Sequence, residues 1–145
     1  MPKSLKLIAT EAEELNILSA ALEGTITSSG EMSFLRTDRA FTLMGSRYRW
    51  EEAETGSRIR VGIYFGDVIT VKAAGISQKN PTEILELLNI SVQANEDAAA
   101  DITLNFAGGG TVLLHTECIN VSLTDTGDAW ATDKRPDHDK QAETA

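Results

Sequence analysis

The sequence has few of the residues on which disulfide-linked, metal-bound or membrane-spanning proteins depend. Its single cysteine, Cys118, excludes a disulfide within the chain. Its two histidines, His115 and His138, give no order that a serine–histidine–aspartate set could use. No apolar run approaches the ~20 residues of a transmembrane helix, so no membrane segment is expected. The chain must therefore fold by burying apolar side chains.

Length and charge narrow the class of protein further. At 145 residues, with 41% hydrophobic residues, the chain fits one domain with a sizeable core. A formal net charge of -9 argues against nucleic-acid binding, which needs a positive surface to displace counterions. The apolar stretch 5–9 is too short for the core of a signal peptide, so a cytoplasmic protein is expected. Nothing in the composition requires a cofactor.

One helix is predicted near the start of the chain. Thr10 and Glu13 have the spacing of a capping box, in which each side chain binds the backbone amide of the other residue. Leucines follow at helical spacing, and Gly24 supplies a left-handed stop. The pattern predicts a helix over 11–23.

Most of the remaining chain alternates as strands do. Gly66-Asp67 predicts a hairpin between the strands on either side of it. Asn80-Pro81 predicts a second helix start, with the apolar residues of 84–88 inside that helix. The predicted strands cover residues 5–9, 25–35, 40–51, 58–65, 68–72, 90–94, 102–106 and 112–123.

These elements predict an α+β fold, in which two helices pack on a mostly antiparallel, strongly curved β-sheet. Residues 1–131 are expected to form a single domain, and the charged residues 132–145 a mobile tail. The order strand, helix, strand, strand occurs in 5–50 and again in 68–123, as a strand-helix-strand-strand pseudo-repeat would. The two halves share little else.

Arginine is the residue that the sequence concentrates most clearly. Six of the seven arginines lie between Arg36 and Arg60. They alternate with apolar residues in Arg47-Tyr48-Arg49-Trp50 and Arg58-Ile59-Arg60-Val61. On strands, this period places the guanidinium groups on one face and the apolar side chains on the other. We therefore expect the arginines to point outward and Tyr48, Trp50, Ile59 and Val61 to point inward.

The two arginine pairs allow opposite interpretations. In one register of a hairpin, Arg49 lies opposite Arg58 and Arg47 opposite Arg60, and such a ladder of like charges needs anions. Guanidinium groups suit phosphate and carboxylate, so the stripe is a candidate binding face. Alternatively, the acids of the same stretch could interleave with the arginines, leaving no binding face. These acids are Asp38, Glu51, Glu52 and Glu54.

Other residues give weaker signals for chemistry. His115 and Cys118, three residues apart in one predicted strand, would lie on opposite faces, which argues against a thiol enzyme. Gly108-Gly109-Gly110 lacks the continuation of a phosphate loop and is expected to be a turn. Asp137-His138-Asp139 has metal-ligand side chains but lies in the tail, without rigid support. No catalytic residue and no metal site is therefore predicted.

The leading functional hypothesis is a non-catalytic binding or interaction module. Its contact face would consist of Arg47, Arg49, Arg58, Arg60, Tyr48 and Trp50. Its partner would be an unidentified protein or an anionic small molecule, and a homodimer could use the same face. The alternative is a small-molecule enzyme that acts on an anionic metabolite in a pocket between sheet and helices.

The order and spacing of several short segments resemble a family of small bacterial proteins catalogued as domain of unknown function 2948, over about residues 5–138. The segments are residues 5–9, 47–51, 106–110 and 117–119, then Trp130 with Arg135-Pro136-Asp137-His138. Gly45-Ser46 departs from the leucine-asparagine expected before Arg47, so a local bend in that strand is predicted. The resemblance implies an alphaproteobacterial, cytoplasmic setting and a tail segment that docks on something. It implies no activity, so no functional residue is carried over.

Overall fold

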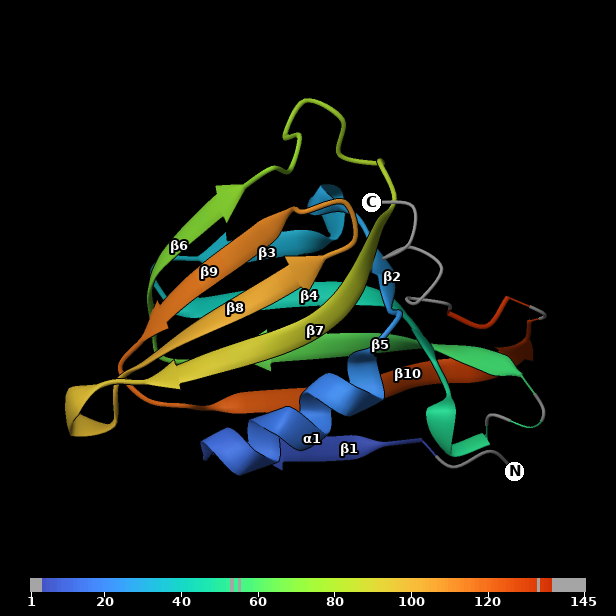
Figure 1. Cartoon of the computed structure of the whole chain (residues 1–145), viewed down its shortest axis with the longest axis horizontal. Helices are drawn as coiled ribbons and strands as arrows, with labels where there is room; N and C mark the ends of the chain where they lie inside the picture. The colour runs from blue at the N-terminus through green and yellow to red at the C-terminus, as the bar shows by residue number, and fades with distance from the viewer. Residues whose placement is uncertain (1–3, 53, 55, 133, 137–145) are drawn as a thin grey trace.

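The computed structural model describes residues 4–52, 54, 56–132 and 134–136. Within them, ten strands form one antiparallel sheet that is accompanied by a single α-helix (Figure 1). The helix α1 spans Ala12–Leu22, and the short turns η1, η2 and η3 span Ser29–Glu31, Trp50–Glu52 and Glu96–Ala98. The strands are β1 (Lys6–Ala9), β2 (Ile26–Thr27), β3 (Met32–Leu35), β4 (Ala40–Tyr48), β5 (Ser57–Phe65), β6 (Val68–Ala74), β7 (Leu85–Ala94), β8 (Ala100–Phe106), β9 (Thr111–Thr116) and β10 (Val121–Ala131).

The short strand β2 joins two portions of the sheet. The strand order is β1-β10-β5-β4-β2-β7-β8-β9-β6, and β3 pairs with β4 beside β2. Ile26 of β2 lies opposite Ser46 on one side and Glu86 on the other. In Figure 1 the β7-β8-β9-β6 portion is drawn in front of β3, β4 and β5. The strand order therefore ends at β6 in one portion and at β1 in the other, and β3 adds a further edge beside β4.

Buried side chains from both portions of the sheet belong to one apolar core. Val61 and Ile63 of β5 lie in the same cluster as Ile102 and Leu104 of β8. The helix α1 contributes its inward leucines, Leu15, Leu18 and Leu22, and packs on β1 and β7. Side chains on β5 and β8 alternate between buried and more exposed positions, which is the pattern of strands with one face on a core.

The prediction of two helices on a strongly curved sheet is wrong. Residues 85–94 form strand β7, and the sheet is not strongly curled. Asn80-Pro81 makes only a turn, in which the amide of Glu83 donates to the carbonyl of Asn80 over 3.1 Å. Pairing of β7 with both β2 and β8 overrides the local helix signal, because each pairing supplies long-range backbone hydrogen bonds. With no helix in this half of the described chain, the pseudo-repeat is also refuted.

Two predicted connections are wrong as well. Strands β5 and β6 follow each other but do not form the predicted hairpin: β5 pairs with β4 and β10, whereas β6 pairs with β9. The single strand predicted over 112–123 is two strands, β9 and β10, separated by residues 117–120. The turn at Gly66-Asp67 was therefore located correctly without its strand partners, and the turn at 117–120 was missed.

The helix near the start of the chain is confirmed, but its capping differs from the prediction. Glu14, rather than Glu13, accepts a hydrogen bond from the backbone amide of Thr10, over 2.9 Å. Gly24 follows the helix with φ of +82°, a conformation that glycine adopts without the usual cost. Gly45 has another role: a Cβ there would lie 2.7 Å from the carbonyl oxygen of Ile26, so glycine lets β2 approach the continuous strand β4.

Candidate functional site

The register of β4 and β5 divides the predicted arginine face between the two faces of the sheet. Arg47 lies opposite Ile59, Tyr48 opposite Arg58, and Ser46 opposite Arg60. Residues directly opposite each other share a face. Arg47 therefore lies on the core side with Ile59, whereas Arg58 and Arg60 lie on the outer side. The predicted ladder of arginine opposite arginine is wrong, since the actual register differs by one residue.

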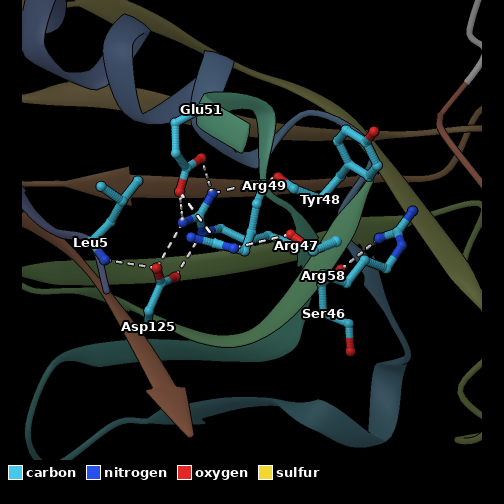
Figure 2. A network of polar contacts seen from close by, with 9 residues as sticks. Leu5, Ser46, Arg47, Tyr48, Arg49, Glu51, Arg58 and Asp125 are labelled. Atoms are coloured by element: carbon cyan, nitrogen blue, oxygen red, sulfur yellow. Dashed lines mark hydrogen bonds and ion pairs between the residues drawn. The ribbon is translucent and has the colours of Figure 1, made fainter. Parts of the chain in front are cut away.

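Arg47 is the centre of a buried ionic network (Figure 2). Its Nε donates to Oδ1 of Asp125 over 2.6 Å, and its Nη2 donates to Oδ2 over 2.7 Å. The same guanidinium donates to both carboxylate oxygens of Glu51, over 3.0 and 2.7 Å. Asp125 also accepts the backbone amide of Leu5 over 2.7 Å. The side chains of Arg47 and Asp125 are both 0% exposed, so this arginine is not available to a partner.

The electrostatics of this network are those of a structural ion pair. Burial on its own would lower the pKa of Arg47, but its hydrogen bonds to Asp125 and Glu51 outweigh this and raise the pKa above the usual range. The hydrogen bonds from Arg47 lower the pKa of Glu51. Two carboxylates therefore compensate the charge where burial would otherwise be very costly. The charge of Arg47 is compensated by Asp125 and Glu51, so it is not available to bind a ligand.

Arg49 is also buried, at 5% exposure. Its Nη1 donates to Oγ of Ser57 over 3.0 Å, and its backbone amide donates to the carbonyl of Ser57 over 2.8 Å. Its Nε lies 3.9 Å from a carboxylate oxygen of Glu51 and has no hydrogen-bond partner within the described residues. Arg49 thus ties the end of β4 to the start of β5.

The aromatic members of the predicted face do not point into the core as predicted. Tyr48 lies on the outer side of the sheet and is buried there, with its ring 4.8 Å from that of Trp50. The indole of Trp50 donates to the carbonyl of Glu23 over 2.8 Å, just after helix α1. The guanidinium carbon of Arg135 lies 5.3 Å from the centre of the Trp50 ring. Trp50 therefore connects the end of β4, the end of α1 and the segment 134–136.

The outward orientation of Arg58 and Arg60 is confirmed. Arg58 donates to the carbonyls of Gly24 and Ser46, over 3.2 and 2.9 Å, and its burial lowers its pKa. Arg60 pairs with Glu31, with 2.5 Å between Nη2 and Oε1. The interpretation in which acids of the chain take up the arginines therefore holds for Arg47 and Arg60. The acids that do so are mostly distant in sequence: of the four that the sequence suggested, only Glu51 pairs with Arg47.

A cavity of about 500 Å³ opens elsewhere, between strands that the sequence did not predict to meet. The residues that line it come from η1, β3, β4, β6 and β9, from the turn after β3 and from the segment 75–84. That segment is held to η1, where Gly30 donates its amide to the carbonyl of Pro81 over 3.0 Å. The main apolar residues that line the cavity are Met32, Phe34, Phe41, Val71, Ile76 and Val112. Ligand pockets usually measure ~300–1,000 Å³, so the cavity is large enough for a small molecule.

Three polar side chains line this cavity: Ser29, Arg36 and Gln78. Arg36 is exposed, and its guanidinium carbon lies 5.5 Å from the centre of the Phe34 ring. The lining includes no carboxylate, histidine or cysteine, so it offers apolar contact and one positive charge without an acid or base. Neither the cavity nor the special position of Arg36 was predicted. No local pattern signals either one, because the cavity depends on which edge strands come together.

The weaker candidates are separated from one another. The Nδ1 of His115 on β9 lies 2.8 Å from Oδ1 of Asp101. Cys118 lies in the turn after β9, and its thiol is 3.4 Å from Oδ2 of Asp67. Burial, with the neighbouring Asp67, raises the pKa of Cys118, which disfavours the reactive thiolate. Gly108 and Gly109 both have positive φ in the turn between β8 and β9, as predicted.

The described residues contain no group of three histidine, cysteine or acidic side chains that could hold a metal ion, and no helix long and apolar enough to cross a bilayer. Asp137-His138-Asp139 lies outside the described residues.

The start of the predicted tail is among the described residues. A Cβ added to Gly24 would overlap the ring of Pro136. Arg135 and Pro136 thus lie directly against the domain.

The short segments on which the family resemblance was based lie in different parts of this fold. Residues 5–9 include β1, residues 47–51 contribute to the Arg47 network, and residues 106–110 span the turn after β8. A family model matches residues 5–138. The chain belongs to the family described as protein of unknown function (DUF2948). No curated protein and no solved structure matches the chain. Membership in DUF2948 therefore supplies no activity, and function must be argued from the cavity and the surface.

Proposed function

We propose that this DUF2948 protein is a non-catalytic binding module that takes a small molecule into the cavity between β3 and β6. The observation that carries the proposal is the cavity itself, with its volume of about 500 Å³ and its largely apolar lining. A space of that size would accommodate on the order of 15 non-hydrogen atoms, at ~30 Å³ for each. Burying apolar ligand surface against these side chains supplies the main favourable free energy of binding.

The arginine and aromatic face is a second candidate surface, in a reduced form. Arg47, Arg49 and Tyr48 are buried and bind parts of the chain itself. Only the outer residues Arg58, Arg60 and Trp50 could contact a protein or a second copy of this chain. Because Arg60 already pairs with Glu31, a partner would have to displace that contact. The cavity needs no such exchange and is the better supported site.

The alternative of an enzyme acting on an anionic metabolite has less support. The cavity lies between strands rather than between sheet and helices, and its lining gives a positive charge without a group suited to proton transfer. A bound anion could be held there, but the lining side chains provide no general base to activate the hydroxyl of Ser29 as a nucleophile. Binding is therefore the simpler use of this geometry.

The test uses an uncharged fluorescent probe, N-phenylnaphthylamine, whose emission rises in apolar surroundings. Ala73 on β6 lines the cavity, and its neighbour Ala74 does not. Both are exposed, so a large side chain at either position is tolerated. Ala73→Phe is expected to abolish most of the fluorescence increase, whereas Ala74→Phe retains it. Equal probe binding by the two folded variants, checked by circular dichroism, would refute the cavity as the binding site.

A further inference from the structure

The arginines between residues 36 and 60 differ in how completely the described protein occupies them. Arg47 and Arg60 form ion pairs with carboxylates, and Arg39 pairs with Glu117 over 2.5 Å. Arg49 and Arg58 donate to oxygens of the chain. Arg36 makes no side-chain hydrogen bond and no ion pair with any described residue. It is therefore the member of this group whose hydrogen-bonding capacity is left for a ligand.

Arg36 also occupies a defined place relative to the cavity. It follows β3 directly and lies over the ring of Phe34, which is itself part of the apolar wall. A cation over an aromatic face is held there by an attraction of ~0.5–1 kcal/mol at exposed sites. The guanidinium is thus placed beside the apolar space, with solvent on its other side. One end of a ligand would meet apolar side chains, and the other would meet a cation.

Resting on the proposed function, we propose that the ligand is an amphipathic carboxylate, with its chain in the cavity and its head group on Arg36. The fork of the guanidinium matches the two oxygens of a carboxylate. Gln78, whose side chain has no hydrogen-bond partner among the described residues, offers a further neutral donor to the same head group. The ligand class follows from the combination of a largely apolar lining with one unpaired positive charge.

The charge of the whole protein limits the ligand to a low charge. The chain carries a formal net charge of -9, so its summed field repels anions approaching from solution. A single arginine can compensate a single negative charge, but not the several charges of a nucleotide or a polyphosphate. A monoanion with a substantial apolar part gains most of its binding free energy from the apolar part and its orientation from Arg36.

The experiment compares decanoate with decanol as competitors that displace N-phenylnaphthylamine. In the unchanged protein, decanoate is expected to displace the probe at about tenfold lower concentration, because a hydrogen bond to a charged group contributes on this scale. In Arg36→Gln, the preference should disappear while decanol displaces the probe as before. Arg36→Lys should retain part of it, since a point charge remains but the fork is lost.

Arg39→Gln is the matched control. It removes the same charge from the same turn, but Arg39 does not line the cavity and pairs with Glu117 instead. If Arg39→Gln reduces the preference as much as Arg36→Gln, the effect is one of general charge and the assignment of Arg36 is refuted. Tighter binding of decyl phosphate than of decanoate would refute the carboxylate class.

The failures of the two proposals can be told apart. If the probe binds in the cavity and decanoate shows no preference over decanol, the carboxylate inference fails and the binding module stands. If Ala73→Phe leaves probe binding unchanged, the proposed function itself fails, and the ligand class fails with it.

Discussion

The two ends of strand β4 show opposite uses of an arginine. At one end, Arg47 is fully buried and donates to two carboxylates; at the other, Phe41 forms part of an apolar cavity beside the unpaired Arg36. The two ends are about 20 Å apart along the strand. The difference lies in the partners: strand β10 brings Asp125 to one end, and the described residues bring no acid to Arg36.

This contrast shows that an arginine-rich stretch is not a functional unit by itself. The stretch contains six positive and four negative residues, yet which arginine is occupied depends on acids from β10 and η1. An arginine in the stretch can therefore stabilise the fold from a buried position, form an ion pair at the surface, or remain free to bind a ligand. The following variants test that ranking.

Arg47→Met is expected to have the largest effect on stability. It leaves Asp125 buried without its main counter-ion, and breaking a buried pair in this way costs about 3–5 kcal/mol. Urea denaturation at neutral pH measures the loss in the free energy of unfolding. The double variant Arg47→Met with Asp125→Leu should recover part of that loss, since it removes both charges. A loss below ~1 kcal/mol for the single variant would contradict the structural role assigned to Arg47.

Glu51→Gln is expected to have a smaller and pH-dependent effect. The pKa of Glu51 is lowered in the folded protein from an ordinary value of 4.5, so its contribution is present above pH 4.5 and is lost as the pH falls through the folded value. We expect a loss of about 1 kcal/mol at neutral pH, discounted because the carboxylate is 35% exposed. Denaturation at a series of pH values should show the difference vanishing in acid. Glu83→Gln, at an exposed position in the 75–84 segment, should show no comparable difference.

Arg60→Gln should change stability by about 0.5 kcal/mol or less. Its pair with Glu31 is half exposed, so solvent screens it, and added salt should reduce the difference further. Thermal unfolding at low and high salt measures both effects. A loss as large as that of Arg47→Met would mean that burial does not distinguish these two arginines.

Arg36→Gln should have the smallest effect on stability, within ~0.5 kcal/mol, because the side chain is exposed and unpaired. The same variant is expected to have the largest effect on the preference for decanoate over decanol. Denaturation and probe displacement on one preparation measure the two quantities together. A marked loss of stability would show that Arg36 supports the fold and would weaken its assignment to a ligand.

Part of this fold could be predicted from local pattern. The helix near the start follows from its leucine spacing and the glycine after it, although the predicted capping box does not form. The alternation in 58–65 correctly separates Ile59 and Val61 from Arg58 and Arg60. The orientation of Arg47 was also available in principle. Phe41 and Leu43 point inward, and residues 45 and 47 follow with the same period. The prediction instead assumed that the apolar rings of Tyr48 and Trp50 point inward, which placed Arg47 outward. Both rings pack on the outer side.

What could not be predicted depends on long-range pairing. The apolar residues of 84–88 fit a helix locally, and only their pairing with β2 and β8 makes them part of a strand. The cavity likewise exists because β3 and β6 lie near each other while each pairs elsewhere. Asp125 did carry a signal, as an acid in phase with the inward residues Val121 and Leu123, but nothing local names Arg47 as its partner.

The pairing of β1 with β10 has a consequence for how this protein is made. The amide of Leu5 reaches the carboxylate of Asp125 across 120 positions of the chain, and β1 finds its strand partner only there. During synthesis, β1 cannot pair until β10 has been made, so apolar edges of the incomplete sheet stay uncovered until then. Such distant closure slows folding. Expression at reduced temperature, or with chaperones in excess, should therefore raise the soluble yield.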